Sequence, residues 1–273
     1  MAIQLIVSDI DGTILDDQHR ISSRLVKTLE NVKARGIVFA LASARPPMGM
    51  TEISKSLGVS HHPLVAYNGA LIQSSALEGS ELMASHCLAS DDLLILLEYL
   101  EKDFKELSPQ LYSHNHWYAK KWDRWTKEEA DITGLTPEIA DLIDLVRQGQ
   151  DIHKLLIIGE ATEVQAFLQV AQGLNLSSLV MGLSKENYLE VTDKVVSKEQ
   201  ALRDLAQHFH IDLEQTMAIG DNFNDLPMLK IAGCGVAMGN APDEVKEGAA
   251  HVTSSHKEDG VAQALEKYVL AKM

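Results

Sequence analysis

Two aspartates, Asp9 and Asp11, follow an apolar run from Ile3 to Val7 that is typical of a buried strand. In extended backbone, side chains at positions i and i+2 project to the same side, so both carboxylates face one region. Like charges this close repel unless a cation or a shared proton relieves them. Gly12 then lets the chain turn away sharply. The segment predicts a divalent-metal site with a carboxylate nucleophile, at the strand end where open α/β sheets bind their ligands.

A second acidic turn, which contains Asp221, Asn224 and Asp225, follows another short apolar run late in the chain. Mg2+ prefers oxygen ligands and is commonly held by one or two carboxylates, water and substrate phosphate. Asp9, Asp11 and Asp221 would supply such a site if their two strands are neighbours. The alternative is that this second segment only forms Asx-type turns. The presence of the first acidic loop favours the metal site.

Ser43 and Lys198 are candidate ligands of an anion. Ser43 comes shortly after the apolar run 37–41, and backbone N–H groups at a strand-to-helix turn can bind phosphate. Ser197 and Gln200 predict a capping box, which places Lys198 in the first turn of a helix. A lysine there opposes the helix dipole, and a bound anion would offset that penalty. For each residue taken alone, a capping serine and a surface lysine are the alternatives.

The elements that must position these residues alternate between strand and helix. The pattern predicts strands at 3–7, 37–41 and 64–66, a helix at 21–35 capped by Ser22 or Ser23, a later helix from Lys198, and strands at 216–219 and 235–238. Repetition of strand, helix and strand predicts an α/β fold whose core is a doubly wound, Rossmann-like parallel sheet with right-handed connections.

The middle of the chain, from about residue 85 to residue 183, differs in composition. It contains all three tryptophans and none of the acidic turns. A leucine-rich helix is expected at 91–106, a strand at 154–159 and a helix at 163–174. These features predict an inserted α/β domain at 85–183, so that residues 1–84 and 184–273 form a discontinuous core.

The composition excludes several classes of partner. Of the 273 residues, 39 are acidic and 24 are basic, which gives a formal net charge of −15. Non-specific binding to nucleic acid or to an anionic membrane depends on clustered Lys and Arg, so this charge argues against both. Cys87 and Cys234 form no disulfide framework and lack metal-ligand spacing, which favours a reducing compartment. No apolar stretch reaches spanning length and no basic leader is present, so a cytoplasmic protein is predicted.

Together these features resemble the haloacid dehalogenase-like hydrolase superfamily, and most closely its Cof-type branch of sugar-phosphate phosphatases with a C2-type cap. The resemblance covers both core segments and is compatible with the insert as the cap. The four superfamily motifs correspond to Asp9-Ile10-Asp11-Gly12-Thr13, Ser43, Lys198, and Gly220-Asp221-Asn222-Phe223-Asn224-Asp225. Three further signatures of the branch are Asn68-Gly69-Ala70, Val236-Ala237-Met238-Gly239-Asn240-Ala241, and Glu258-Asp259-Gly260-Val261-Ala262.

The resemblance implies a phosphoric monoester hydrolase that works through a phosphoaspartyl intermediate. Asp9 is expected to attack phosphorus, and Asp11 to act first as general acid and then as general base. Mg2+ is expected to be bound by Asp9, the backbone carbonyl of Asp11, and Asp221. Asp225 would orient Lys198 or the metal site. The expected phosphate ligands are Ser43, Lys198, Asn224 and the backbone amides of Ile10 and Ala44.

Several positions depart from the usual pattern of the branch. The second motif is Ser43-Ala44-Arg45 where Thr-Gly-Arg is customary. Near the third motif, the usual Pro, Gly and Gly are replaced by Asp193, Val195 and Glu199, and near the C-terminus His256 replaces an asparagine. None of these changes removes a catalytic group, and they bear on substrate range and turnover. In the insert, His114, His116, Trp117, Trp122 and Trp125 either shape a leaving-group pocket or belong to the packing and surface of the insert, and the second interpretation is favoured.

The predicted function is hydrolysis of small phosphate monoesters, with sugar phosphates as the first expectation. Pyridoxal phosphate or a nucleotide is the alternative substrate. The alternative from another class is a regulatory protein that binds a phosphorylated metabolite with little turnover, although such a protein would not need an acid two residues beyond the nucleophile. The expected partner is a small-molecule ester, and the expected state is a monomer or a homodimer.

Overall fold

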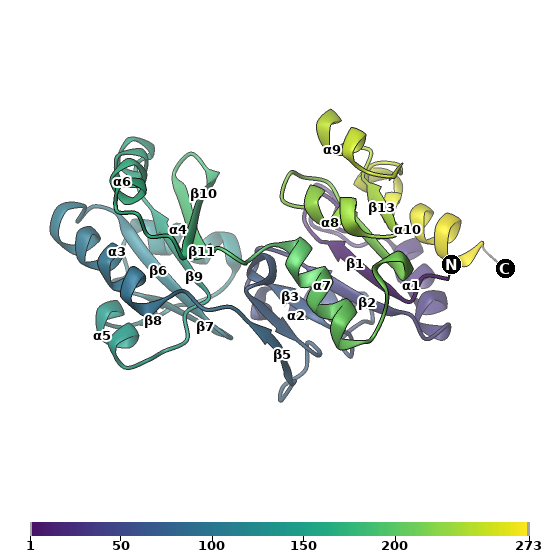
Figure 1. Cartoon of the computed structure of the whole chain (residues 1–273), viewed down its shortest axis with the longest axis horizontal. Helices are drawn as coiled ribbons and strands as arrows, with labels where there is room; N and C mark the ends of the chain where they lie inside the picture. Colours follow the sequence, from purple (N-terminus) through teal and green to yellow (C-terminus); the bar gives the residue numbers. More distant parts are fainter. Residues whose placement is uncertain (1, 272–273) are drawn as a thin grey trace. The chain divides into compact units, whose positions relative to one another are not determined.

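The computed structural model describes residues 2–271 and divides into two compact units (Figure 1). One unit contains the residues up to Ala84 and those from Ser197 onward, and the other contains Ser85–Val196. The second unit begins at the predicted residue 85 and ends beyond the predicted residue 183. The later end has a local cause, because residues 179–185 and 188–193 form a hairpin that pairs with a strand of the second unit.

The first unit is built around an eight-stranded sheet in the order β14-β13-β12-β1-β2-β3-β4-β5. Neighbours from β14 to β3 are parallel, whereas β4 is antiparallel to β3. The strands are β1 (Leu5–Asp9), β2 (Val38–Ala42), β3 (Leu64–Ala66), β4 (Leu71–Gln73), β5 (Leu82–Ser85), β12 (Thr216–Gly220), β13 (Cys234–Ala237) and β14 (His251–Val252). The helices are α1 (Ser23–Ala34), α2 (Thr51–Ser56), α7 (Lys198–His208), α8 (Leu226–Ile231), α9 (Asp243–Gly248) and α10 (Gly260–Leu265).

Both faces of the parallel part of this sheet are buried. On one face, Leu5 and Val7 share an apolar core with residues of α7, α8 and α9. Ile6 and Phe39 point to the opposite face and are fully buried as well. A continuous apolar run is the pattern that a parallel strand needs when helices cover it on both sides. The doubly wound α/β core that the sequence predicts is therefore confirmed.

Serine caps begin the two longest helices of this unit. Ser22 accepts a hydrogen bond from the backbone N–H of Leu25 at 3.1 Å, which decides between the two predicted caps of α1. Ser197 accepts one from the N–H of Gln200 at 3.0 Å and begins α7 at the predicted residue. The side chain of Gln200 donates to Asp204 instead of reaching back, so only half of the predicted capping box forms.

The second unit contains a six-stranded sheet in the order β10-β11-β9-β6-β7-β8. Its neighbours are antiparallel except for β7 and β8. The strands are β6 (Ser108–Ser113), β7 (His116–Ala119), β8 (Glu138–Ile139), β9 (Lys154–Ile158), β10 (Leu179–Lys185) and β11 (Tyr188–Asp193). The helices are α3 (Ser90–Asp103), α4 (Arg124–Thr133), α5 (Leu142–Arg147) and α6 (Ala161–Gly173).

One face of the second sheet packs against α3, α5 and α6 in a leucine-rich core. The other face carries polar and aromatic residues, and Tyr112 there donates a hydrogen bond to Glu129 of α4 at 3.2 Å. Trp117 is buried and stacks on Tyr112, Trp125 is buried, and Trp122 is exposed. Packing, the favoured interpretation, thus accounts for two of the three tryptophans.

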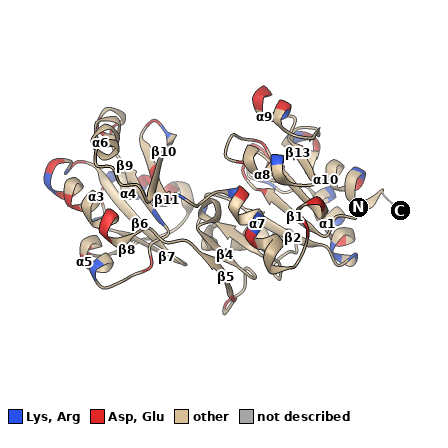
Figure 2. Cartoon of the chain, viewed as in Figure 1, with Lys and Arg blue, Asp and Glu red and all other residues tan. Residues whose placement is uncertain are grey.

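Figure 2 shows acidic and basic residues on helices of both units. No helix in the part of the chain that the structure describes is long and apolar enough to cross a bilayer.

Candidate active site

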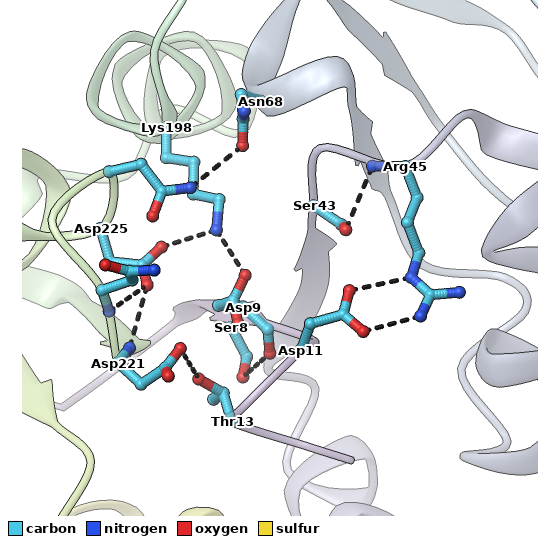
Figure 3. Close-up of polar contacts among 12 residues, drawn as sticks. Ser8, Asp9, Asp11, Thr13, Ser43, Arg45, Asn68, Lys198, Asp221 and Asp225 are labelled. Atoms are coloured by element: carbon cyan, nitrogen blue, oxygen red, sulfur yellow. Dashed lines mark hydrogen bonds and ion pairs between the residues drawn. The ribbon is translucent and has the colours of Figure 1, made fainter. Parts of the chain in front are cut away.

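β1 and β12 are direct neighbours in the sheet, so their carboxyl ends bring the two acidic loops together (Figure 3). Asp9 is the last residue of β1, and Asp221 directly follows β12. Lys198, the first residue of α7, reaches the same place and contacts Asp9. All of these residues belong to the first unit, although the insert separates them in the sequence.

A cation-binding geometry is present among the acids. One carboxylate oxygen each from Asp9, Asp221 and Asp225 lie within 4.8 Å of one another. Oδ2 of Asp9 is buried and has no hydrogen-bond partner among the described residues, which is costly unless a ligand satisfies it. Gly12 permits this approach, because its φ is +80° and a Cβ there would lie 2.3 Å from Oδ2 of Asp221. Hard carboxylate oxygens with one acceptor left unsatisfied fit Mg2+.

The electrostatics of the site point the same way. Burial, together with the charges of Asp225 and Asp221, raises the pKa of Asp9 to about 7, against the opposing effect of Lys198. Burial and the charge of Asp225 likewise raise the pKa of Asp221 to about 6. Without a cation, these carboxyl groups therefore hold protons far more tightly than ordinary aspartates. A divalent ion would displace those protons and relieve the repulsion.

Lys198 lies at the centre of this network, and its side chain is 1% exposed. Its ammonium group donates hydrogen bonds to Oδ1 of Asp9 and, at 2.6 Å, to Oδ1 of Asp225. Burial alone would lower the pKa of Lys198, but the two carboxylates outweigh it and hold that pKa above its usual value. The other oxygen of Asp225 accepts the backbone N–H groups of Asp221 and Asn222 at 2.9 and 3.0 Å. Asp225 thereby fixes the ammonium group and the acidic loop together.

The carboxylate of Asp11 is turned away from this cluster. Its oxygens accept hydrogen bonds from Nε of Arg45 at 2.8 Å and from Nη2 at 2.7 Å. The side chain of Asp11 therefore does not join those of Asp9 and Asp221 as predicted, whereas the carboxylate of Asp225 lies beside them. The physical reason is that a guanidinium fork binds a carboxylate through two parallel hydrogen bonds, which outcompete a position among like charges.

The remaining expected phosphate ligands lie on the loops around Asp9. Ser43 is buried just beyond β2, and its Oγ accepts the backbone N–H of Arg45 at 3.2 Å (Figure 3). Ala44 is part of the same turn. Ile10 is fully buried, and its carbonyl accepts several N–H groups of the following turn. Asn224 is exposed, and its amide donates to Oδ1 of Asn68 at 3.3 Å.

Three polar residues of the site were not predicted as functional. Thr13 donates to Oδ1 of Asp221 at 3.2 Å, and the amide of Asn240 lies 3.3 Å from Oδ2 of the same residue. Asn240 also donates to the carbonyl of Gly12 at 2.8 Å. The third of these residues is Arg45, which binds the carboxylate of Asp11. Each of the three lies within a motif recognised in the sequence, and this was the one indication of a functional role. A sequence does not show which residue a turn side chain will bind.

Two of the departures from the usual pattern have local partners in the structure. Glu199 forms an ion pair with Arg203 at 2.8 Å, one helical turn further on, so its charge has a partner other than the adjacent Lys198. His256 contacts Asp17 through Nε2 at 2.7 Å, and its backbone N–H donates to Oδ1 of Asn240.

Comparisons with known proteins agree with this arrangement. The model of the haloacid dehalogenase-like hydrolase family matches residues 6–265. A Haemophilus influenzae protein provisionally assigned as a phosphatase is 36% identical over 268 residues, which cover 98% of each chain. The Bacillus subtilis protein YcsE, named 5-amino-6-(5-phospho-D-ribitylamino)uracil phosphatase, is 30% identical over 98% of this chain and 96% of its own.

The fold is shared with solved structures as well. The crystal structure of a haloacid dehalogenase-like hydrolase from Bacteroides thetaiotaomicron superimposes with a TM-score of 0.86 at 30% identity, and covers 97% of this chain and 99% of its own. Family model, relatives and structure extend over nearly the whole sequence. The chain belongs to the haloacid dehalogenase-like hydrolase family, in its Cof-type branch, and is a phosphoric monoester hydrolase.

Proposed function

We propose that this protein is a Mg2+-dependent phosphatase of small phosphate monoesters, foremost sugar phosphates, and that it forms an aspartyl phosphate on Asp9. The observation that carries the proposal is the unsatisfied Oδ2 of Asp9, a buried carboxylate oxygen beside Lys198 and Asp221. A nucleophile needs a free lone pair, and a phosphoryl group needs positive charge on the side from which it is approached. A protein that only binds a phosphorylated metabolite would need the positive charge but no free carboxylate oxygen facing the phosphate.

In the proposed reaction, an Asp9 oxygen attacks phosphorus, the new O–P bond forms, and the bond to the leaving oxygen breaks. Asp11 gives its proton to the leaving alkoxide, and then removes a proton from the water that hydrolyses the aspartyl phosphate. Arg45 holds Asp11 between these steps, since its fork binds the carboxylate form. Hydrolysis regenerates Asp9 and releases inorganic phosphate.

The proposed metal ligands are the carboxylates of Asp9 and Asp221 and the backbone carbonyl of Asp11. Mg2+ bound there would neutralise charge on the transferring phosphoryl group. Lys198 would bind a phosphate oxygen while Asp225 keeps its ammonium group in place. The other proposed phosphate ligands are Ser43, Asn224 and the backbone amides of Ile10 and Ala44.

The substrate class is supported by one relative. YcsE is named for an ester that carries its phosphate on a ribityl chain, which is a reduced five-carbon sugar. A phosphorylated polyol or sugar as substrate suits that name, and the polyol or sugar hydroxyl is then the leaving group that Asp11 would protonate. Pyridoxal phosphate and nucleotides are the competing esters. We further propose that the unit Ser85–Val196 is a C2-type cap that selects the ester, and that the enzyme works in the cytoplasm, where Cys87 and Cys234 stay free thiols.

A panel of phosphate esters ranked by kcat/KM tests the proposal. It should include hexose and pentose phosphates, ribityl phosphates, pyridoxal phosphate and nucleoside monophosphates, each with Mg2+ and with EDTA. We expect sugar or polyol phosphates to rank first, and EDTA or Asp9→Asn to abolish phosphate release. Asp212→Asn is the matched control, because Asp212 is an exposed acid that precedes β12 at the opposite end of the strand. Absence of release across the whole panel would favour the low-turnover binding protein.

A further inference from the structure

The turn that links β3 to β4 has an unusual backbone. Tyr67, Asn68 and Gly69 have φ angles of 52°, 56° and 113°, so three consecutive residues lie in the left-handed half of conformational space. This region is unfavourable for a bulky residue such as Tyr67, whose side chain is buried. Such backbone persists only where surrounding contacts enforce it, and it concentrates at functional sites.

The contacts that enforce this turn come from two other segments of the active site. The backbone N–H groups of Tyr67 and Asn68 donate to the carbonyls of Arg45 at 3.1 Å and of Ser43 at 2.8 Å. Gly69 lies against the start of α7, where an added Cβ would be 2.7 Å from the carbonyl of Ser197. The turn therefore joins the Ser43 loop to the helix terminus that carries Lys198.

The side chain of Asn68 extends from this turn toward the site (Figure 3), and its Oδ1 accepts a hydrogen bond from Nδ2 of Asn224 at 3.3 Å. An asparagine amide has a donor end and an acceptor end, and a flip exchanges them. Oδ1 of Asn68 can only accept a hydrogen bond, so the NH2 group of Asn224 faces Asn68. The second N–H of that NH2 group then remains available to an anion, whereas the flipped amide would direct an oxygen there.

We propose that Asn68 is a positioning residue of the phosphate site, which acts by fixing the amide orientation of Asn224. This inference rests on the proposed function, in which Asn224 binds a phosphate oxygen. Among the described residues, Asn68 makes no hydrogen bond to the acidic cluster itself. The strained backbone is explained at the same time, since it is the conformation that directs this side chain at Asn224.

Asn68→Gly is the decisive variant, because glycine adopts a positive φ freely and so removes the side chain while sparing the backbone. We expect kcat/KM to fall about tenfold with an unchanged thermal midpoint. The dissociation constant of inorganic phosphate, measured separately by calorimetry, should rise by a similar factor. Asn68→Ala should show the same kinetic loss together with a lower thermal midpoint, since alanine is strained at this φ. Asn175→Gly is the control, as Asn175 is an exposed asparagine with a φ of 54° in the second unit.

A double-mutant cycle with Asn224→Ala separates positioning from a general structural role. If Asn68 acts through Asn224, Asn68→Gly will cost less than about twofold once Asn224 is alanine. Equal losses in both backgrounds would overturn the inference, and so would wild-type kinetics and phosphate affinity in Asn68→Gly. Failure of the proposed function is distinguishable, because the parent protein itself would then release no phosphate from any ester.

Discussion

Replacing Asp221 by asparagine should have opposite effects on stability in the absence and in the presence of Mg2+. In the folded protein without metal, the pKa of Asp221 is raised from 3.8 to about 6, with burial as the largest cause and the charge of Asp225 as the next. The folded state therefore binds a proton more tightly than the unfolded state does. Metal-free stability falls as the pH rises from about 4 to about 6, and the full penalty is present above that window.

A shift of this size corresponds to about 3 kcal/mol at about 1.4 kcal/mol per pKa unit. Asp221 is partly exposed, so solvent screening reduces the penalty to about 1–2 kcal/mol. Asparagine has a similar shape and no charge, and it should raise the free energy of unfolding by that amount at pH 8 in EDTA. For a chain of this size, the thermal midpoint should rise by about 2–6 °C. Mg2+ at a hundred times its dissociation constant would stabilise the parent protein by about 3 kcal/mol, which reverses the order.

The assay is thermal unfolding of both proteins at pH 5 and pH 8, with EDTA and with Mg2+. The stabilisation by asparagine should be about half as large at pH 5 as at pH 8, because pH 5 lies in the middle of the window between the two pKa values of Asp221. Asp212→Asn removes one charge from an exposed position and should change none of these differences. The electrostatic reasoning would be refuted if the variant were less stable than its parent in EDTA at pH 8. It would also be refuted if Mg2+ raised the thermal midpoint of the variant as much as that of the parent.

Three further outcomes follow from the site. Lys198→Ala should lower kcat/KM by about a thousandfold in a steady-state assay, because it removes the buried positive charge, while the exposed Lys230→Ala leaves kcat/KM unchanged. Asp11→Asn should slow the release of phosphate from sugar phosphates much more than from p-nitrophenyl phosphate, because nitrophenolate leaves without a proton; equal losses would remove Asp11 from the acid step. Mg2+ affinity measured by calorimetry should increase from pH 5 to pH 8, since the pKa values of Asp9 and Asp221 are raised to about 7 and 6 and protons compete below them; a flat profile would contradict this.

Local sequence rules predicted most of the core. The apolar run before Asp9 became β1, the run before Ser43 became β2, and Ser197 capped α7. These elements depend on periodicity and on hydrogen bonds between residues three or four apart, which a sequence displays directly. That β1 and β12 are neighbours was a condition of the predicted metal site, and the structure meets it.

The parts that were missed depend on long-range choices of side chains. Asp11 prefers Arg45 to the acidic cluster, and no spacing rule ranks a bidentate ion pair against a shared cation. The amide of Gln200 prefers Asp204 to its predicted cap partner. The end of the insert was placed at residue 183, inside β10, because nothing in the sequence shows that β10 pairs with β11 in an antiparallel hairpin.

The central position of β1 has a consequence for synthesis on the ribosome. The strand emerges first, but one of its neighbours, β12, emerges only after the whole insert (Figure 1). The insert is a compact unit and can complete its own folding while β1 still lacks that partner. Pairing of β1 with β12 closes the longest loop between paired strands and is expected to be slow. A nascent chain released before Thr216 would therefore carry a finished insert and no acidic centre at all.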